Sequence, residues 1–287
     1  MNKKLASLLR HLCFALKILV GSILLALVLK MFVFASCRIP SWSMVPALLP
    51  GDQVLVSRLG LGARVGCGDN PGTDGVTRLW GISKVKRNDV LLFNFPYSDW
   101  DKLGFDFAVY YMKRCVAIPG DTFYIENGIY RVKGSRERLG NYDAQRKFAC
   151  LNEDSIAPQI YHCFPFDGRH NWTVRHFGPL YVPRKGDVIA IDTLNIAFYR
   201  NLIRYETGKE ISVKQGRVYL GREFLSKYAF RKNYYFMAGD LVHDSKDSRY
   251  WGLLPEDHIV GKAVLIWKSQ DMKTGKFRWD RFLKWVE

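Results

Sequence analysis

Two short segments far apart in the chain carry side chains that could perform nucleophilic catalysis together. Residues 40–46 have the sequence PSWSMVP, which offers two serines, and residues 111–114 have the sequence YMKR, which offers Lys113. A serine hydroxyl is a weak nucleophile unless a base removes its proton, and a lysine acts as that base only when its amine is neutral near pH 7. The pairing therefore predicts Ser-Lys catalysis, the chemistry of a Ser-Lys protease.

The segment around Lys113 has the alternation of a strand. One face of residues 107–118 would carry Phe107, Val109, Tyr111, Lys113, Cys115 and Ala117, with Arg114 on the other face. An amine among apolar neighbours loses its hydration, which favours the neutral form and can lower a lysine pKa by several units from about 10.4. A simpler interpretation is an edge-strand lysine that prevents sheet pairing, with the serines as turn residues beside prolines.

The composition is that of a basic, globular protein. Of 287 residues, 48% are hydrophobic and 14% aromatic, which allows the core of one large domain or two small ones. Lysine and arginine outnumber the acidic residues by 43 to 27, so the surface should attract anionic lipid or nucleic acid. We find no basic run interleaved with aromatic residues and no zinc-finger or RNA-binding motif. We therefore expect membrane lipid, and no nucleic acid, as a partner.

The cysteines indicate neither a metal site nor a cofactor site. The chain has 6 cysteines and no Cys-x-x-Cys pair, and His162 with Cys163 and Cys150 lacks the spacing of zinc ligands. We expect no metal and no organic cofactor. In an oxidising compartment the spacing leaves a Cys150–Cys163 disulfide open without proving it.

The first part of the chain is predicted to anchor it in a membrane. Residues 1–11 form a basic tail, and residues 12–36 are almost wholly apolar, interrupted by Lys17 and Lys30, which can reach toward the two interfaces. A span over 12–30 or over 18–37 fits equally well. The basic tail favours a cytoplasmic N-terminus and a single-pass topology in the cytoplasmic membrane, with residues 37–287 as the outer domain. The alternatives are a cleavable signal peptide, for which the apolar stretch is long, and a buried soluble helix.

The outer domain is predicted to be mainly β. Short β-branched or aromatic runs bounded by Gly, Pro or Asp predict strands at 53–57, 89–95, 107–118 and 186–192. Asn127-Gly128 between residues 122–126 and 129–132 predicts a hairpin, because this dipeptide accepts the positive φ of a type I′ turn. Residues 196–207 could form a short helix. The glycine-rich stretch near 60–82 and the irregular stretch near 134–217 are predicted insertions.

Several motifs occur in a fixed order along residues 40–263. PSWSMVP at 40–46 is followed by Gly51-Asp52, YMKRCVAIPGD occupies 111–121, and Gly239-Asp240 precedes DSRYWG at 247–252 and PEDHIVGKA at 255–263. Together these segments resemble the motifs of the bacterial type I signal peptidases, a family of membrane-anchored Ser-Lys proteases. The resemblance leaves residues 60–82 and 134–217 outside the motifs.

The resemblance implies a role for each matching residue. It makes Ser43 the nucleophile and Lys113 the general base that later protonates the leaving amine. Ser41 would help to hold the oxyanion together with the Ser43 backbone N–H, because such donors meet charge that develops only in the transition state. Ser245 matches a serine that orients the lysine. The pair that supports the site would be Asp247 with Arg249.

This chain departs from the family pattern at two places. Trp42 stands where the family usually has glycine, and Leu241-Val242 stand where Asn-Arg is usual. The tryptophan could crowd the substrate groove, and the apolar pair removes polar support. Neither change removes the nucleophile or the base, so we expect activity with altered efficiency or cleavage-site tolerance. His243 lies nearby, but we interpret it as a solvent-exposed loop residue rather than as part of a Ser-His triad.

The resemblance implies removal of signal peptides from translocated preproteins, with a preference for Ala-x-Ala before the cleaved bond. Three alternatives remain open: a mitochondrial-type inner-membrane peptidase, a self-cleaving repressor, and an inactive relative that binds preproteins. The repressor would need a DNA-binding helical domain, whereas this chain begins with an apolar span. The predicted insertions disfavour the mitochondrial enzyme.

Overall fold

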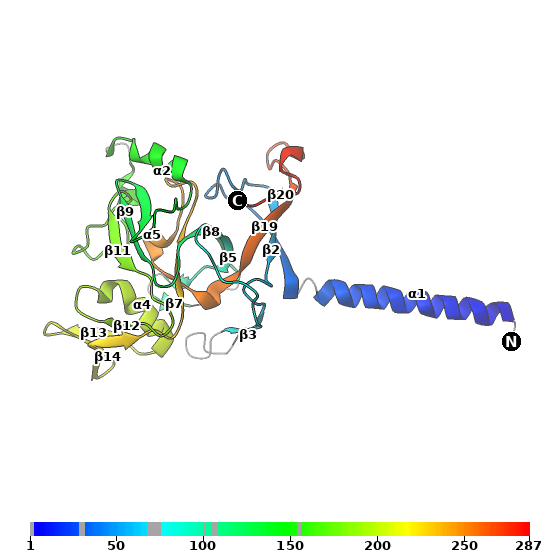
Figure 1. Ribbon diagram of the computed structural model, residues 1–287, viewed down its shortest axis with the longest axis horizontal. Coiled ribbons are helices and arrows are strands. Elements are labelled where there is room, and N and C mark those ends of the chain that lie inside the picture. Colours follow the sequence, from blue (N-terminus) through cyan, green and yellow to red (C-terminus); the bar gives the residue numbers. More distant parts are fainter. Residues whose placement is uncertain (1–2, 29–31, 68–75, 100–101, 105–107, 154–155) are drawn as a thin grey trace.

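A computed structural model describes residues 3–28, 32–67, 76–99, 102–104, 108–153 and 156–287 of the chain. A long helix, α1 (Lys3–Val28), extends from a β-rich body that contains the rest of these residues (Figure 1). The body confirms the predicted mainly β fold. Helix α1 is apolar around most of its circumference, and none of its segment Arg10–Val28 is buried within the protein. By length and composition this segment can cross a membrane, since its 19 residues rise about 28 Å.

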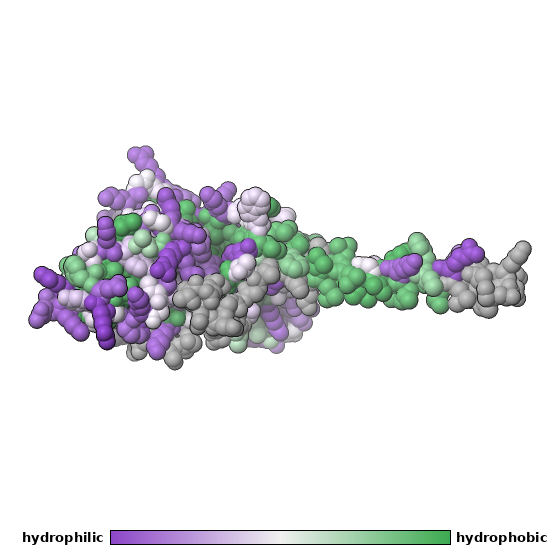
Figure 2. Space-filling view, turned by 90° about the horizontal axis from the view of Figure 1, so that it is seen from below, coloured by the Kyte–Doolittle hydropathy of each residue, from purple (hydrophilic) through white to green (hydrophobic). Residues whose placement is uncertain are grey.

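The end of α1 differs from the predicted end of the anchor. Strand β1 (Phe34–Arg38) pairs with β2 (Asp52–Ser57), so residues 34–36, which the composition assigned to the anchor, belong to the main sheet. The helix also ends well before residue 37, the end of the second predicted register. Hydropathy could not separate the two elements, because a membrane helix and the strand that follows it are both apolar. Figure 2 shows hydrophobic surface continuing from α1 onto the adjoining part of the body.

The main sheet carries both predicted catalytic segments. Its strand order is β1-β2-β19-β5-β8-β17-β18, with β20 paired to β19, and its neighbouring strands are antiparallel. Lys113 lies on the interior strand β8, and the serine loop joins β1 to β2 at the edge. The strands not yet given are β5 (Val90–Asn94), β8 (Tyr110–Ala117), β17 (Tyr234–Ala238), β18 (Leu254–Pro255), β19 (Ile259–Ser269) and β20 (Lys284–Trp285).

A second layer lies at the end of the body away from α1 (Figure 1). It contains the sheet β10-β9-β11, formed by Ile129–Val132, Thr122–Glu126 and Phe177–Tyr181, and the helices α2 (Tyr142–Ala149) and α4 (Ile196–Thr207). Phe123 of β9 stacks on Phe236 of β17, with ring centroids 4.3 Å apart. Residues of the predicted 134–217 insertion are buried in the same apolar core as β8 and β17. The insertion therefore completes the core rather than forming a lobe of its own.

The remaining elements are short. They are β3 (Arg64–Cys67), β4 (Val76–Arg78), β6 (Tyr97–Asp99), β7 (Lys102–Leu103), α3 (Pro158–Tyr161), β12 (Val188–Ala190), β13 (Ile211–Lys214), β14 (Arg217–Leu220), β15 (Glu223–Phe224), β16 (Lys227–Ala229), α5 (Ser248–Trp251), η3 (Glu256–His258) and η4 (Trp279–Arg281). β3 pairs with β4 inside the predicted 60–82 insertion.

Most of the predicted elements are confirmed with small changes of boundary. The predicted strands correspond to β2, β5, β8 and β12, although Phe107 lies outside the described residues. The predicted hairpin is β9–β10, and Asn127 and Gly128 both adopt positive φ, 51° and 79°, as a type I′ turn requires. Helix α4 has the predicted bounds and ends at Gly208, whose φ of 66° is the left-handed conformation typical of a helix C-cap.

Candidate active site

The loop between β1 and β2 holds Ser43 in a fixed position. Its apolar side chains Ile39, Met44 and Leu48 are buried against the main sheet. Within the loop, the Leu48 N–H donates to the Met44 carbonyl at 2.9 Å, and the Gly51 N–H donates to the Ile39 carbonyl at 2.9 Å. The loop is therefore closed on itself, and Ser43 precedes one of its buried anchors.

A buried ion pair fixes the end of this loop. Asp52 is fully buried and accepts hydrogen bonds from the Leu49 N–H at 2.8 Å, the Ser269 hydroxyl at 2.6 Å and the Arg281 guanidinium at 2.6 Å. Gly51 has a φ of 94°, and a Cβ there would lie 1.9 Å from the Gln270 carbonyl oxygen. Only glycine fits at that position, which explains the Gly-Asp pair that follows the serine segment.

The lysine amine and the serine hydroxyl meet in the interior. Lys113 Nζ donates a hydrogen bond to Ser43 Oγ, and the two residues are only 4% and 9% exposed. Burial lowers the pKa of Lys113 to about 8; Asp247 opposes this shift, and Arg249 adds to it. The predicted apolar face is confirmed, because Tyr111 and Cys115 on the same face pack into an apolar cluster.

Ser41 lies beside Ser43, the predicted nucleophile. Its Oγ is 3.4 Å from Ser43 Oγ, so a carbonyl oxygen of a substrate bonded to Ser43 would lie close to the Ser41 hydroxyl. A hydroxyl in that position can donate to an oxyanion as charge develops. The geometry is compatible with the role that the resemblance implies for Ser41.

Ser245 approaches the nucleophile segment from the other side. A Cβ on Gly239 would lie 2.1 Å from Ser245 Oγ and 2.7 Å from the Ser43 carbonyl oxygen, so glycine is what allows these groups to meet. Ser245 is 8% exposed, and its Oγ has no hydrogen-bond partner among the residues that the structure describes. Its role in orienting Lys113 therefore stays a prediction.

Asp247 and Arg249 form a fully buried pair beneath the site. Arg249 Nε and Nη2 donate to the two carboxylate oxygens of Asp247 at 2.8 Å each, and the Gly239 N–H donates to Asp247 at 2.9 Å. Burial alone would raise the pKa of Asp247, but Arg249 outweighs it and the net shift is downward. The charged carboxylate thus holds Gly239, which in turn sets the approach of Ser245 to Ser43.

A second buried pair near the site received no role in the sequence analysis. Arg114 donates to the two oxygens of Asp240 at 2.7 Å and 2.6 Å, and also to the backbone carbonyl of Glu287 at 2.8 Å. It joins β8, the end of β17 and the last residue of the chain. Two features of the sequence could have predicted this pair. One is the position of Arg114 on the strand face opposite Lys113, and the other is the Asp that follows Gly239.

The dyad opens into a groove of about 540 Å³. It is lined by residues 37–44, by residue 108 and the first half of β8, by Leu92 and by Asp244 and Lys246. Trp42 is 54% exposed and lines the groove. Trp42 therefore lies at the groove, and the prediction that it could crowd a substrate there stays a prediction.

The structure also shows where the second departure from the family pattern and His243 lie, and whether Cys150 and Cys163 are paired. The Leu241 N–H donates to the Ser43 carbonyl at 3.0 Å, and Val242 is buried in the core. His243 lies in an exposed turn, as predicted. Cys150 and Cys163 are both free, so the disulfide left open by the sequence is not formed.

A buried lysine hydrogen-bonded to a serine inside a groove is the arrangement expected of a Ser-Lys peptidase, and comparison with known proteins gives the same class. Residues 13–268 match the family model described as "Signal peptidase, peptidase S26". The chain belongs to this family, and it is a hydrolase of the signal peptidase class.

Curated relatives named Signal peptidase I agree with this assignment. The protein from Buchnera aphidicola subsp. Baizongia pistaciae is 28% identical over 266 residues, which are 89% of this chain and 76% of that protein. The protein from Pseudomonas aeruginosa is 27% identical over 255 residues, covering 85% and 68%. The protein from Aquifex aeolicus is 26% identical over 253 residues, covering 86% and 80%.

Proposed function

We propose that this protein is a membrane-bound serine endopeptidase that removes signal peptides from translocated preproteins with a Ser43–Lys113 dyad. The observation that carries the proposal is the buried hydrogen bond between the Lys113 amine and the Ser43 hydroxyl, inside a groove open to substrate. A pKa of about 8 leaves roughly a tenth of the amine neutral at pH 7, which suffices for general-base catalysis.

The reaction would proceed in two steps, acylation of Ser43 and hydrolysis of the acyl-enzyme. Lys113 takes the hydroxyl proton as Ser43 Oγ bonds to the scissile carbonyl carbon, and the Ser41 hydroxyl and the Ser43 N–H hold the oxyanion. The C–N bond then breaks, and the Lys113 ammonium gives its proton to the leaving amine, which leaves an acyl-enzyme. In the second step Lys113 takes a proton from water as the water oxygen bonds to the acyl carbon. The bond from that carbon to Ser43 Oγ then breaks, the Lys113 ammonium returns its proton to Ser43 Oγ, and the signal peptide leaves as an acid that ionises to a carboxylate in water.

The dyad is proposed to work at the outer surface of the cytoplasmic membrane. Helix α1 would span the membrane once with its basic N-terminal tail inside, because cytoplasmic ends carry an excess of lysine and arginine. The groove lining at Cys37 and Arg38 begins 9 positions after Val28, the last residue of α1. A signal peptide that is still partly in the bilayer would therefore reach the groove from the anchor side.

An aromatic cluster on the body supports contact with lipid. Phe277, Trp279 and Phe282 pack against one another with centroid distances of 4.5 to 6.0 Å, and Trp279 is 75% exposed. Trp285, on the strand that pairs with β19, is 69% exposed. Large exposed aromatic side chains favour the interface between water and hydrocarbon.

The test of the proposed function is cleavage of a labelled preprotein by the purified full chain in detergent. We expect cleavage after the signal peptide by the wild type and loss of at least three orders of magnitude in kcat/KM in Ser43→Ala and in Lys113→Ala. Undiminished cleavage in either variant would falsify the dyad. Binding of the preprotein without cleavage by the wild type would instead identify an inactive relative.

A further inference from the structure

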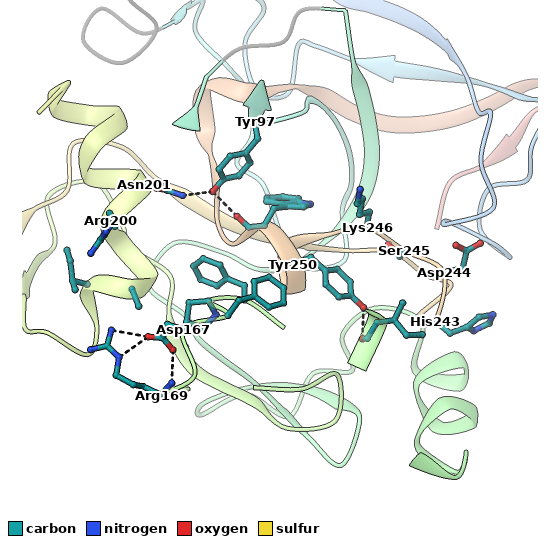
Figure 3. Close-up of a pocket in the computed structure, with 17 residues that line it drawn as sticks. Tyr97, Asp167, Arg169, Arg200, Asn201, His243, Asp244, Ser245, Lys246 and Tyr250 are labelled. Atoms are coloured by element: carbon teal, nitrogen blue, oxygen red, sulfur yellow. Dashed lines mark hydrogen bonds and ion pairs between the residues drawn. The ribbon is translucent and has the colours of Figure 1, made fainter. Parts of the chain in front are cut away.

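A second cavity lies next to the catalytic groove. It measures about 820 Å³, and its walls come from residues 160–169, from α4 and from the segment that leads into α5 (Figure 3). Asp244 and Lys246 line both cavities, and Ser245 between them lines the second. The two cavities therefore adjoin at the loop of residues 241–246.

This loop begins at the nucleophile. The Leu241 N–H donates to the Ser43 carbonyl at 3.0 Å, and the Asp244 N–H donates back to the Leu241 carbonyl at 3.1 Å. Asp244 and Lys246 of this loop line both cavities, so the loop connects the groove around Ser43 Oγ to the second cavity.

The position of α1 indicates which part of a bound substrate lies toward the membrane anchor and which part lies away from it. The groove runs along residues 37–44, whose start follows α1 closely in the chain, whereas α4 lies at the opposite end of the body (Figure 1). The apolar part of a signal peptide stays in the bilayer, so the residues before the cleaved bond occupy the groove on the anchor side. The residues after the bond must leave past Asp244 and Lys246.

We propose that the second cavity binds the first residues of the mature polypeptide, those directly after the cleaved bond. This inference rests on the proposed function and adds a substrate-binding subsite to it. The volume is in the range of sites that enclose a small ligand, and it has room for a few residues in extended conformation.

The lining indicates which mature sequences fit best. Phe166, Ile196, Tyr250 and Trp251 supply apolar surface, as do other members of the lining. The charged members are Asp167, Arg169, Arg200, Asp244 and Lys246. Asp167 pairs with Arg169 at 3.1 Å, so these two charges offset each other, and Arg200, Asp244 and Lys246 remain as the other charged members of the lining.

Arg200 gives the cavity a preference for acidic substrates. It projects from α4 at the cavity wall, and the structure shows it in no ion pair within the part of the chain that it describes (Figure 3). A Glu or Asp shortly after the cleaved bond would find this guanidinium, whereas a Lys or Arg would be repelled by it. The cavity therefore favours acidic over basic side chains in the first few mature positions.

The test uses peptides that share one signal-peptide half and carry a single Glu, Gln or Lys at position two, three, four or five after the cleaved bond. We expect the wild type to cleave the Glu peptide with a kcat/KM about threefold above that of the Lys peptide at one of these positions. Arg200→Glu should reverse this ratio. Arg222→Glu, the same charge change at an exposed turn outside the cavity, should preserve it.

A second variant tests whether the substrate occupies this cavity by filling part of its volume rather than by changing its charge. Ala197 lines the cavity from α4, and Ala197→Trp should raise KM severalfold for peptides that extend five residues past the cleaved bond, with no effect on peptides that end one residue past it. Equal Glu/Lys ratios in the wild type and Arg200→Glu, together with an unchanged KM in Ala197→Trp, would overturn the subsite while leaving the proposed function intact. Absence of cleavage of every peptide by the wild type would overturn both.

Discussion

The amine of Lys113 donates a hydrogen bond to the hydroxyl of Ser43, although the two residues are 70 positions apart in the chain. Both are largely buried and line the catalytic groove, so few water molecules compete for their hydrogen bond. An interior strand of the main sheet and a loop at its edge thus bring the amine and the hydroxyl together. The protonation state of Lys113 should therefore control both activity and stability.

The pH dependence of cleavage should follow Lys113. Because burial lowers its pKa to about 8, kcat/KM is expected to rise about tenfold per pH unit below pH 8 and to level off above it. The measurement is kcat/KM for a signal-peptide substrate between pH 5 and 10. His243→Ala should keep the same limb, and a limb that moves in this variant instead would contradict the assignment.

The same shift makes stability depend on pH in a defined direction. The amine titrates near 8 when folded and near 10.4 when unfolded, so the unfolded chain binds more protons between these values and stability rises with pH there. Below pH 8 the buried ammonium costs about 3 kcal/mol, at about 1.36 kcal/mol per pKa unit. Lys113→Met should therefore be inactive yet more stable than the wild type at pH 6.

Denaturant unfolding from pH 6 to 10.5 checks this expectation. The advantage of Lys113→Met should shrink above pH 8, as the wild type no longer retains the charge. Lys147→Met, at an exposed position of α2, controls for the loss of a lysine at the surface. An advantage that is the same at every pH would argue against a buried, titrating amine.

Breaking the buried Asp247–Arg249 pair should strongly lower the free energy of unfolding. Asp247→Asn keeps the shape of the side chain but leaves the fully buried Arg249 charge without its carboxylate, at a cost of about 3–5 kcal/mol. Glu210→Gln, which removes a carboxylate paired with Arg204 at the surface, should cost less than about 1 kcal/mol. The free energies of unfolding of the two variants in urea decide the comparison, and similar losses would refute it.

Gly239 should tolerate no side chain. The methyl group of Gly239→Ala would overlap Ser245 Oγ and the Ser43 carbonyl, so the nucleophile loop must shift and kcat should fall by about two orders of magnitude. Gly134 has open space around it, so Gly134→Ala is the control. It should be destabilised only because alanine is strained at a φ of 78°, and it should retain kcat. Near-normal kcat in Gly239→Ala would show that Ser245 and Ser43 need not approach so closely.

Trp42 should restrict the choice of cleavage site. Its exposed ring lines the groove two residues after Pro40, so Trp42→Gly is expected to widen the groove and raise kcat/KM for substrates with larger residues before the cleaved bond. A series of peptides with Ala, Val or Leu directly before the bond provides the measurement. If the relative rates match those of the wild type, the ring has no part in selecting the substrate.

The contact of the body with lipid can be tested separately. Trp279→Ala combined with Trp285→Ala removes the most exposed rings of the aromatic cluster and its neighbouring strand, and should weaken binding of the chain without α1 to anionic phospholipid vesicles. The chain without α1 must first be shown to fold by circular dichroism. Trp80→Ala, at a fully exposed ring outside the cluster, is the matched control, and equal binding by all three proteins would contradict the proposed surface.

The sequence by itself determined the local elements and led to the hypothesis of a Ser43–Lys113 dyad. Alternation around Lys113, the Asn127-Gly128 turn and the bounds of α4 depend on neighbouring residues, whose spacing and backbone preferences are local properties. The apolar stretch indicated a helix able to cross a membrane, and the motif residues indicated the family that the whole-chain comparison then established.

Only the tertiary structure decided how these parts meet. The end of α1 and the start of β1 could not be separated by hydropathy, because pairing with β2, not composition, makes residues 34–38 a strand. The Arg114–Asp240 pair and the second cavity join residues that are distant in the chain, and no local pattern encodes such contacts. Long-range packing sets the hydration of a buried amine, so the depressed pKa of Lys113 became definite only once its surroundings were in place.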